Sequence, residues 1–176
     1  EGRTAGLGPV LSYLTKIVDL TVSEDVWGLF DPAATLSREP ASFILDVKGT
    51  GRWYQDIMDP AIDMDAPEPP GQIDTLDLTQ VLVKAAGAEV AATGALTVDN
   101  SGATTLQGMP APTGTINLDI KGVSKLIDNL IAMGLLPDDQ AMGARMMLGM
   151  FTRPGAAPDQ VTSVIEFKDG GLFANG

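Results

Sequence analysis

The sequence predicts an α+β fold: a twisted antiparallel β-sheet with helices packed on one face, built from two strand-helix repeats. Apolar residues alternate with polar ones over several segments, whereas other segments space their apolar residues as a helix does. The pentapeptide Leu45-Asp46-Val47-Lys48-Gly49 also returns almost unchanged as Leu118-Asp119-Ile120-Lys121-Gly122, and helical spacing follows both copies. We therefore expect a single domain over residues 1–176, with repeat copies at about 42–108 and 115–176.

Composition excludes several classes of function. The chain has 176 residues, enough for one stable domain, and a net charge of −12 that repels nucleic acid and anionic lipid headgroups. It contains no cysteine and no histidine, which removes disulfides, thiol chemistry and catalysis by imidazole. No apolar run reaches the roughly 20 residues of a transmembrane helix. Because the chain starts at Glu1 without a methionine and stops soon after the strand-like residues 172–174, we expect it to be a fragment of a longer protein.

Two helices are expected before the first strand. Pro9 precedes a helical stripe of apolar residues, which predicts an amphipathic helix; the stripe consists of Val10, Leu11, Leu14, Ile17 and Val18. Ser23 is then a suitable N-cap, with Glu24 and Asp25 in the first turn. A second, shorter helix should therefore follow and end at Asp31-Pro32.

The first repeat begins with a strand. From Ser42 onward, Phe43, Leu45 and Val47 alternate with Ile44, Asp46 and Lys48, a pattern typical of a half-buried strand. Gly49 to Gly51 should break this strand. A short helix should follow, carrying Trp53, Tyr54, Ile57 and Met58, and residues 59–71 should form an exposed loop rich in proline and acid.

Three further strands are expected at residues 73–84, 89–98 and 115–121, joined by short turns that imply antiparallel neighbours. The apolar alternation slips between Leu78 and Val81, which predicts a bulge. The second repeat then shows helical spacing from Val123 to Gly134 and a second helix after Pro137. A hairpin of residues 161–168 and 172–174, with its turn at Asp169-Gly170, closes the chain.

Carboxylates are the main candidates for metal binding or acid–base chemistry. The proline-rich loop carries Asp56, Asp59, Asp63, Asp65 and Glu68, which offer oxygen ligands of the kind that calcium or magnesium takes. Their spacing lacks the glycine and terminal glutamate of an EF-hand, so a hydrated loop is the favoured interpretation. Asp99-Asn100-Ser101-Gly102 is described completely as a turn, and Asp138-Asp139 as favourable charges in a first helical turn. We therefore predict no catalytic residue, no metal ligand and no cofactor.

The most unusual feature is a methionine-rich helix. Met142, Met146, Met150 and Phe151 would provide a flexible apolar surface that suits varied partners, so we assign them to an apolar ligand or partner surface. A helix buried on both sides within a core would have the same composition, and core packing is the favoured interpretation. Both interpretations stay open at this point.

Parts of the sequence resemble a known family. The run from Met133 to Phe151, the segment Trp27-Gly28-Leu29-Phe30-Asp31-Pro32 and the terminal Ala174-Asn175-Gly176 are similar to the domain of unknown function 2125 family. The resemblance implies an uncharacterised alphaproteobacterial protein that is exported to the periplasm, with this chain as its C-terminal part. Residues 94–99 and 114–118 are more distantly similar in pattern to AsmA-like envelope proteins, which implies a link with lipid transport or outer-membrane homeostasis.

Three functions are considered. The first is a non-enzymatic periplasmic domain that binds a lipid or another apolar ligand in a groove between the sheet and the methionine-rich helix. The second is a structural or scaffold domain that uses the same surface to bind another envelope protein; an exposed apolar patch without a cavity would favour it. The third, an enzyme, would need carboxylate or metal chemistry from loop residues such as Asp63 and Asp65.

Overall fold

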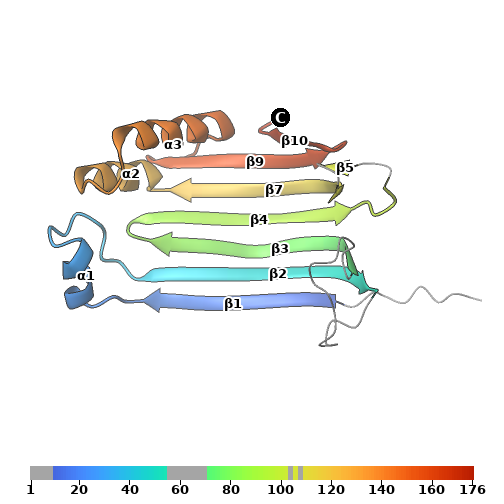
Figure 1. Cartoon of the computed structure of the whole chain (residues 1–176), viewed down its shortest axis with the longest axis horizontal. Helices are drawn as coiled ribbons and strands as arrows, with labels where there is room; N and C mark the ends of the chain where they lie inside the picture. The colour runs from blue at the N-terminus through green and yellow to red at the C-terminus, as the bar shows by residue number, and fades with distance from the viewer. Residues whose placement is uncertain (1–9, 55–70, 103–104, 107–108) are drawn as a thin grey trace, which may run out of the picture.

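An eight-stranded antiparallel sheet dominates the computed structural model, which describes residues 10–54, 71–102, 105–106 and 109–176 (Figure 1). The sheet contains β1 (Val10–Leu20), β2 (Ala41–Trp53), β3 (Gly71–Ala85), β4 (Ala88–Val98), β7 (Pro112–Lys121), β8 (Arg153–Pro154), β9 (Gln160–Lys168) and β10 (Gly171–Ala174). Two short strands, β5 (Thr105–Leu106) and β6 (Met109–Pro110), pair with each other. The helices are α1 (Glu24–Phe30), α2 (Val123–Ala132) and α3 (Asp138–Phe151). The α+β class and the antiparallel sheet are confirmed.

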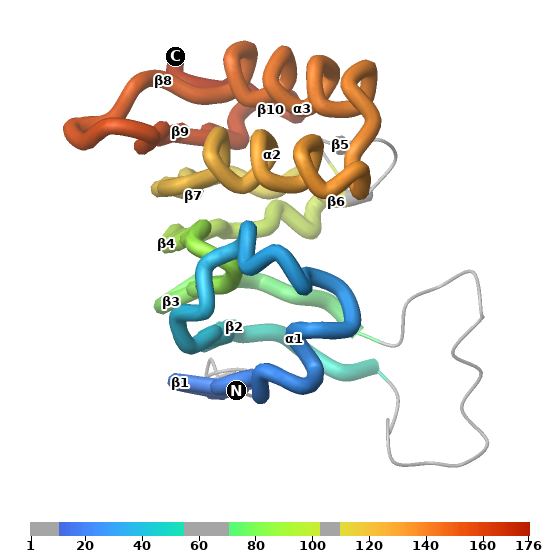
Figure 2. The backbone as a smooth tube through the Cα atoms, turned by 90° about the vertical axis from the view of Figure 1, so that its left-hand side faces the viewer, coloured from blue at the N-terminus to red at the C-terminus, as the bar shows by residue number. Residues whose placement is uncertain are grey.

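The strand order is β1-β2-β3-β4-β7-β9-β10, and β8 pairs with β9 beside β10. The helices gather at the end of the sheet where β1, β3 and β7 finish, and α3 lies beyond β9 in both views (Figures 1 and 2). Within the described residues, the substantial helix contacts join α2 to α3 and α2 to β4. The described helices therefore lie at one end of the sheet and not over its middle. None of the described helices has the length and apolar content needed to cross a membrane.

The prediction of a helix over residues 10–18 is wrong, because this segment is strand β1. It pairs with β2 from Val10 opposite Thr50 to Leu20 opposite Ala41. The apolar spacing of the segment also fits an edge strand with apolar side chains on both faces, and tyrosine, threonine, isoleucine and valine favour strands. The spacing of apolar residues within the segment fits both a helix and a strand. Pairing with β2 selects the strand.

The strand-helix repeat is not reproduced in the first copy. Gly122 has φ 70° and stands at the start of α2, whereas the matching Gly49 lies inside β2, which continues through Gly51 to Trp53. The predicted break at Gly49 to Gly51 and the helical placement of Trp53 are therefore wrong. Ile57 and Met58 lie outside the described residues.

The other helices and strands predicted from the sequence are confirmed, including the short helix after Ser23 and both helices of the second repeat. The register of β3 with β4 shifts between Leu78 and Val81, where the sequence predicts a bulge. Asp169 and Gly170 both have positive φ, 51° and 71°, as a two-residue hairpin turn requires. Gly134, with φ 70°, follows the end of α2.

Strand register places one apolar and uncharged grid on a single face of the sheet. We call this surface the apolar face. Because directly opposed residues in antiparallel strands share a face, the four rows follow from the pairing. The rows are Ile17-Phe43-Val83-Val90-Ile120-Val161, Thr15-Leu45-Val81-Ala92-Leu118-Ser163, Tyr13-Val47-Leu78-Gly94-Ile116-Ile165 and Leu11-Gly49-Leu76-Leu96-Gly114-Phe167. The opposite, polar face carries cross-strand charge pairs such as Lys84 with Glu89 and Glu89 with Lys121.

No second layer buries either face of this sheet. Among the described strand residues, the buried ones are Ile44, Gly49, Gly51, Ala92 and Ser163. The large side chains of the apolar face keep part of their surface exposed, for example Phe43 at 38% and Val83 at 41%. The described part of the molecule is an open, single-layer sheet with helices at one end.

A substitution at Gly51 tests the corrected course of β2. A Cβ atom there would lie 2.3 Å from the carbonyl oxygen of Gln72, so Gly51→Ala should lower the free energy of unfolding by about 1–3 kcal/mol through overpacking. Chemical denaturation measures this change. The control is Gly28→Ala in α1, where a Cβ would meet nothing within 4 Å. This substitution should stabilise the helix by about 0.5–1 kcal/mol. Stabilisation by both substitutions would contradict the strand at Gly51.

Candidate functional site

The methionine-rich surface predicted from the sequence lies on the outer side of α3. Met142, Met146, Met150 and Phe151 are 66%, 63%, 68% and 43% exposed, whereas Ala141 on the opposite side of the helix is 1% exposed. The three methionines are four residues apart and form one stripe along the helix. They neither pack in a core of this chain nor line any of its described cavities.

Polar contacts in the middle and at the C-terminal end of α3 hold the helix in this orientation. Arg145 forms an ion pair with Asp128 of α2, across from the methionine stripe. At the C-terminal end, Thr152 Oγ1 donates a hydrogen bond to the carbonyl of Leu148 at 2.6 Å. Asn175 Nδ2 donates to the carbonyl of Phe151 at 2.9 Å and so ties the helix end to the last residues of the chain. The outward presentation of the stripe is therefore fixed by the fold.

The apolar face of the sheet is a larger candidate surface that residue-by-residue reading missed. Its exposure is greatest toward β1, where Tyr13 is 59% and Ile17 48% exposed. The chain contains 11 basic and 23 acidic residues, and none of them lies in the four rows of the apolar face. The signal was present in the period-two alternation of each strand. Only the register between strands shows that these residues form one surface.

Among the depressions of the described part of the molecule, two open ones lie on the polar face of the sheet and beside α3. One, of about 320 Å³, is lined by β4, β7 and β9 residues that include Asn117, Asp119 and Thr162. Asp119 Oδ2 accepts a hydrogen bond from Gln160 at 2.5 Å, and Oδ1 lies 3.7 Å from Lys121 Nζ, so this carboxylate has structural partners. The other, of about 390 Å³, lies between α2, α3 and β9 and is lined by residues such as Leu148 and Val161.

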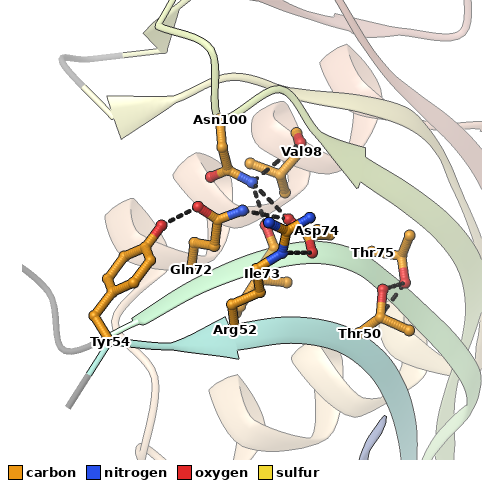
Figure 3. A network of polar contacts seen from close by, with 9 residues as sticks. All are labelled: Thr50, Arg52, Tyr54, Gln72, Ile73, Asp74, Thr75, Val98 and Asn100. Atoms are coloured by element: carbon orange, nitrogen blue, oxygen red, sulfur yellow. Dashed lines mark hydrogen bonds and ion pairs between the residues drawn. The ribbon is translucent and has the colours of Figure 1, made fainter. Parts of the chain in front are cut away.

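A polar network ties the turn after β4 to the ends of β2 and β3 (Figure 3). Asn100 Nδ2 donates hydrogen bonds to the carbonyl of Ile73 at 2.9 Å and to Asp74 Oδ1 at 3.2 Å. Gln72 Nε2 also donates to Asp74 Oδ1, at 2.6 Å, and Arg52 Nε lies 3.8 Å from Asp74 Oδ2. The predicted turn at Asp99-Asn100-Ser101-Gly102 is confirmed, since Asp99 Oδ1 accepts the amide of Ser101 and Gly102 has φ 76°. The network is a structural clamp at the end of the sheet opposite the helices.

A buried carboxylate organises the corner between α1 and β2. Asp31, 1% exposed, accepts the backbone amides of Thr35 and Leu36 at 2.9 Å each. The guanidinium of Arg38 lies 3.4 Å from Asp31 Oδ2 and 4.3 Å from the ring centre of Trp27. Burial raises the pKa of Asp31, but the hydrogen bonds from Leu36 and Thr35 and the charge of Arg38 outweigh it and hold the pKa below its usual value. The corner is therefore a structural site built on an ionised carboxylate.

The N-terminus of α2 is capped by a residue from a distant segment. Gly122, at the N-cap position, has no side chain, and Asp159 accepts the amides of Ser124 and Lys125 at 3.1 and 3.0 Å instead. Burial raises the pKa of Asp159, but these hydrogen bonds, that from Lys125 first, lower it below the ordinary value. Sequence analysis missed this cap because the two segments meet only in the folded chain.

No metal centre is found among the described residues, where no three carboxylates come close enough to share an ion. The loop carboxylates Asp56, Asp59, Asp63, Asp65 and Glu68 lie outside the described residues. The prediction that they form a hydrated loop stays a prediction.

Comparison with known proteins gives one match. A family model described as "Uncharacterized protein conserved in bacteria (DUF2125)" matches residues 20–176. No curated protein and no solved structure matches the chain. The match covers the sheet from β2 onward, all three helices and the methionine stripe.

The outward position of the methionine stripe predicts that it contributes little to stability. Met146→Gln should change the free energy of unfolding by less than about 0.5 kcal/mol, because the side chain already faces solvent. Ala141→Met, on the buried side of the same helix, should cost about 1–3 kcal/mol through overpacking. Thermal or chemical denaturation of both variants checks this. A large loss for Met146→Gln would show that the stripe packs in a core after all.

The cap at Asp159 predicts a pH-dependent contribution to stability. Asp159→Asn should lower the free energy of unfolding at pH 7 by about 0.3–1 kcal/mol, because the charge at the helix N-terminus is lost. The pKa of Asp159 is lowered in the folded protein. The difference in the free energy of unfolding between the wild type and Asp159→Asn should therefore have its full size above about pH 4. It should shrink toward zero as the pH falls through the lower pKa that Asp159 has in the folded protein.

The matched control for this measurement is Asp169→Asn, because Asp169 has nearly the same backbone conformation, φ 51° against 52°, but lies in a hairpin turn. Denaturation curves over a pH series compare the two variants. An Asp159→Asn difference that stays constant at acid pH would contradict the cap.

Proposed function

The chain belongs to the DUF2125 family of uncharacterised bacterial proteins, and on that premise we propose that it is a non-catalytic binding domain of the cell envelope. Its apolar face would pack against another protein. One observation carries the proposal: four rows of uncharged, mostly apolar side chains cross six strands, and the described helices lie at one end of the sheet and leave most of these rows uncovered. Contiguous apolar surface of this extent is rare on a monomer and typical of an interaction site.

The dimensions of the face suit a protein partner. Six strands about 4.8 Å apart and four rows about 6.7 Å apart span roughly 29 by 27 Å, or about 780 Å². A standard protein–protein interface takes about 800 Å² from each partner. A second β-layer is the natural complement, because sheets pack face to face through interdigitating side chains of this kind.

The shape of the face is less suited to a lipid carrier. Small-molecule sites are concave and bury 70–90% or more of a ligand's surface, whereas an acyl chain lying on an open sheet would leave much of its own surface in water. Met142, Met146 and Met150 face outward and do not line the depression of about 390 Å³ between α2, α3 and β9. Lipid binding therefore becomes the competing outcome of the test.

The methionine stripe supports the same class of function. A row of flexible, exposed apolar side chains at i, i+4 and i+8 suits docking of another protein. Leu135, in the loop before α3, is also 60% exposed. The domain would therefore offer partner surfaces both on the sheet and on α3, in agreement with a scaffold role.

Site-specific photo-crosslinking in the native host tests the proposal. A photoreactive residue at position 83 on the apolar face should link the full-length protein to a discrete protein partner. The matched control is position 164, because Val83 and Val164 are the same residue type and are 41% and 44% exposed, but Val164 lies on the polar face. The partner should be captured from position 83 and not from position 164.

Substitution of the same two valines provides the second arm. Val83→Lys should reduce partner capture at least tenfold, because a buried unpaired charge in an interface costs more than 1.4 kcal/mol. Val164→Lys should leave it unchanged. Equal capture from both positions would overturn the proposal, as would adducts formed only with lipid at position 83, which would favour the lipid carrier.

A further inference from the structure

Strand β1 forms one edge of the sheet among the described residues. β1 pairs with β2 on its inner side, and no described strand pairs with its outer side. The outer side of an edge strand presents unpaired backbone amides and carbonyls, which are a template for another strand. β1 has 11 residues, twice the length of an average strand.

The features that normally protect an edge are missing from β1. Natural edge strands are kept short, interrupted by proline, bulged, or charged. β1 contains no proline and only two charged residues, Lys16 and Asp19, and its bulge lies at its end, beyond Ile17. Leu14 and Val18, on the polar face of the sheet, are 63% and 47% exposed. An added strand would cover these side chains and would also form hydrogen bonds with the backbone amides and carbonyls on the outer side of β1.

The opposite edge is protected. It ends in two short strands, β8 with two residues and β10 with four, which lie end to end along β9. The side chain of Arg153 donates a hydrogen bond to the carbonyl of Asn175 and bridges the two. A head-to-tail chain of copies would need this edge to accept β1. Because it offers no long strand, two copies can pair only through their free edges, which closes the assembly.

We propose that two copies of this chain associate through their β1 strands, antiparallel and related by a two-fold axis perpendicular to the sheet. The regular part of β1 ends near Ile17. A two-fold axis at Leu14 lets most of this regular part pair with the β1 strand of the second copy, and it does not place Lys16 opposite Lys16 of that copy. It opposes Leu14 to Leu14 and Lys16 to Ser12, so no like charges face each other. β1 has one basic and one acidic residue in a chain of net charge −12, which makes it a nearly neutral edge.

The axis keeps the apolar faces of both copies on the same side. The rows that begin at Ile17, Thr15, Tyr13 and Leu11 would then run on into the second copy, and the apolar face would double in width. This inference does not depend on the proposed function, because the backbone edge exists whatever covers the face.

Cysteine scanning tests the pairing directly, because the native chain contains no cysteine. Single substitutions Ser12→Cys, Leu14→Cys and Lys16→Cys all lie on the same face of β1. Mild oxidation should form a disulfide dimer at position 14, where the residue opposes itself within bonding range, and much less at positions 12 and 16. The control Leu29→Cys, in α1 at 84% exposure, should remain monomeric.

Sedimentation equilibrium without crosslinking supplies the second measurement. The wild-type chain should show a monomer–dimer equilibrium, and Leu14→Lys should weaken it at least tenfold by placing two ammonium groups opposite each other. The control Leu29→Lys should leave it unchanged, and thermal unfolding confirms that both variants fold. A wild-type chain that stays monomeric at all concentrations, or a dimer that Leu14→Lys leaves intact, would overturn the inference. Neither outcome would affect partner binding by the apolar face.

Discussion

The structure depends on the backbone ladder that joins β1, β2, β3, β4, β7 and β9, rather than on a buried core. Few described side chains are fully buried, and those of the sheet are mostly small residues or glycines. Pairing between neighbouring strands therefore sets the positions of the elements. Cross-strand side-chain contacts, each worth about 0.2–1 kcal/mol, add to this ladder on both faces.

This constraint explains why the apolar face can exist uncovered in one chain. Register aligns the apolar residues of six strands into rows, and the same register places lysine, aspartate and glutamate on the other face. The helices are attached to the strand ends by local polar contacts. Asp31 and Arg38 hold the corner after α1, and Asp159 holds the start of α2. Because these contacts lie at the end of the sheet, the helices leave its middle open.

Much of this fold could be predicted where one local pattern had one structural solution. The alternation of β3, β4, β7 and β9, the bulge after Leu78 and the Asp169-Gly170 turn all follow from side-chain period and from residues that tolerate positive φ. Prediction failed where a pattern had two solutions. Residues 10–18 satisfy a helical stripe and an edge strand equally, and a glycine can end a strand, as Gly122 does, or relieve close packing within one, as Gly49 does beside the carbonyl of Thr75.

The sequence by itself determined the antiparallel α+β class, the positions of most strands and helices, the strong negative charge and the selection of Met142, Met146, Met150 and Phe151 as an unusual apolar set. These properties depend on neighbours within a few positions along the chain. Only the tertiary structure decided that the methionines face outward, that the apolar residues of six strands form one open surface, and that β1 is a free edge. Each of these depends on which distant segments pair, and pairing is a property of backbone hydrogen bonds between residues that the linear order does not bring together.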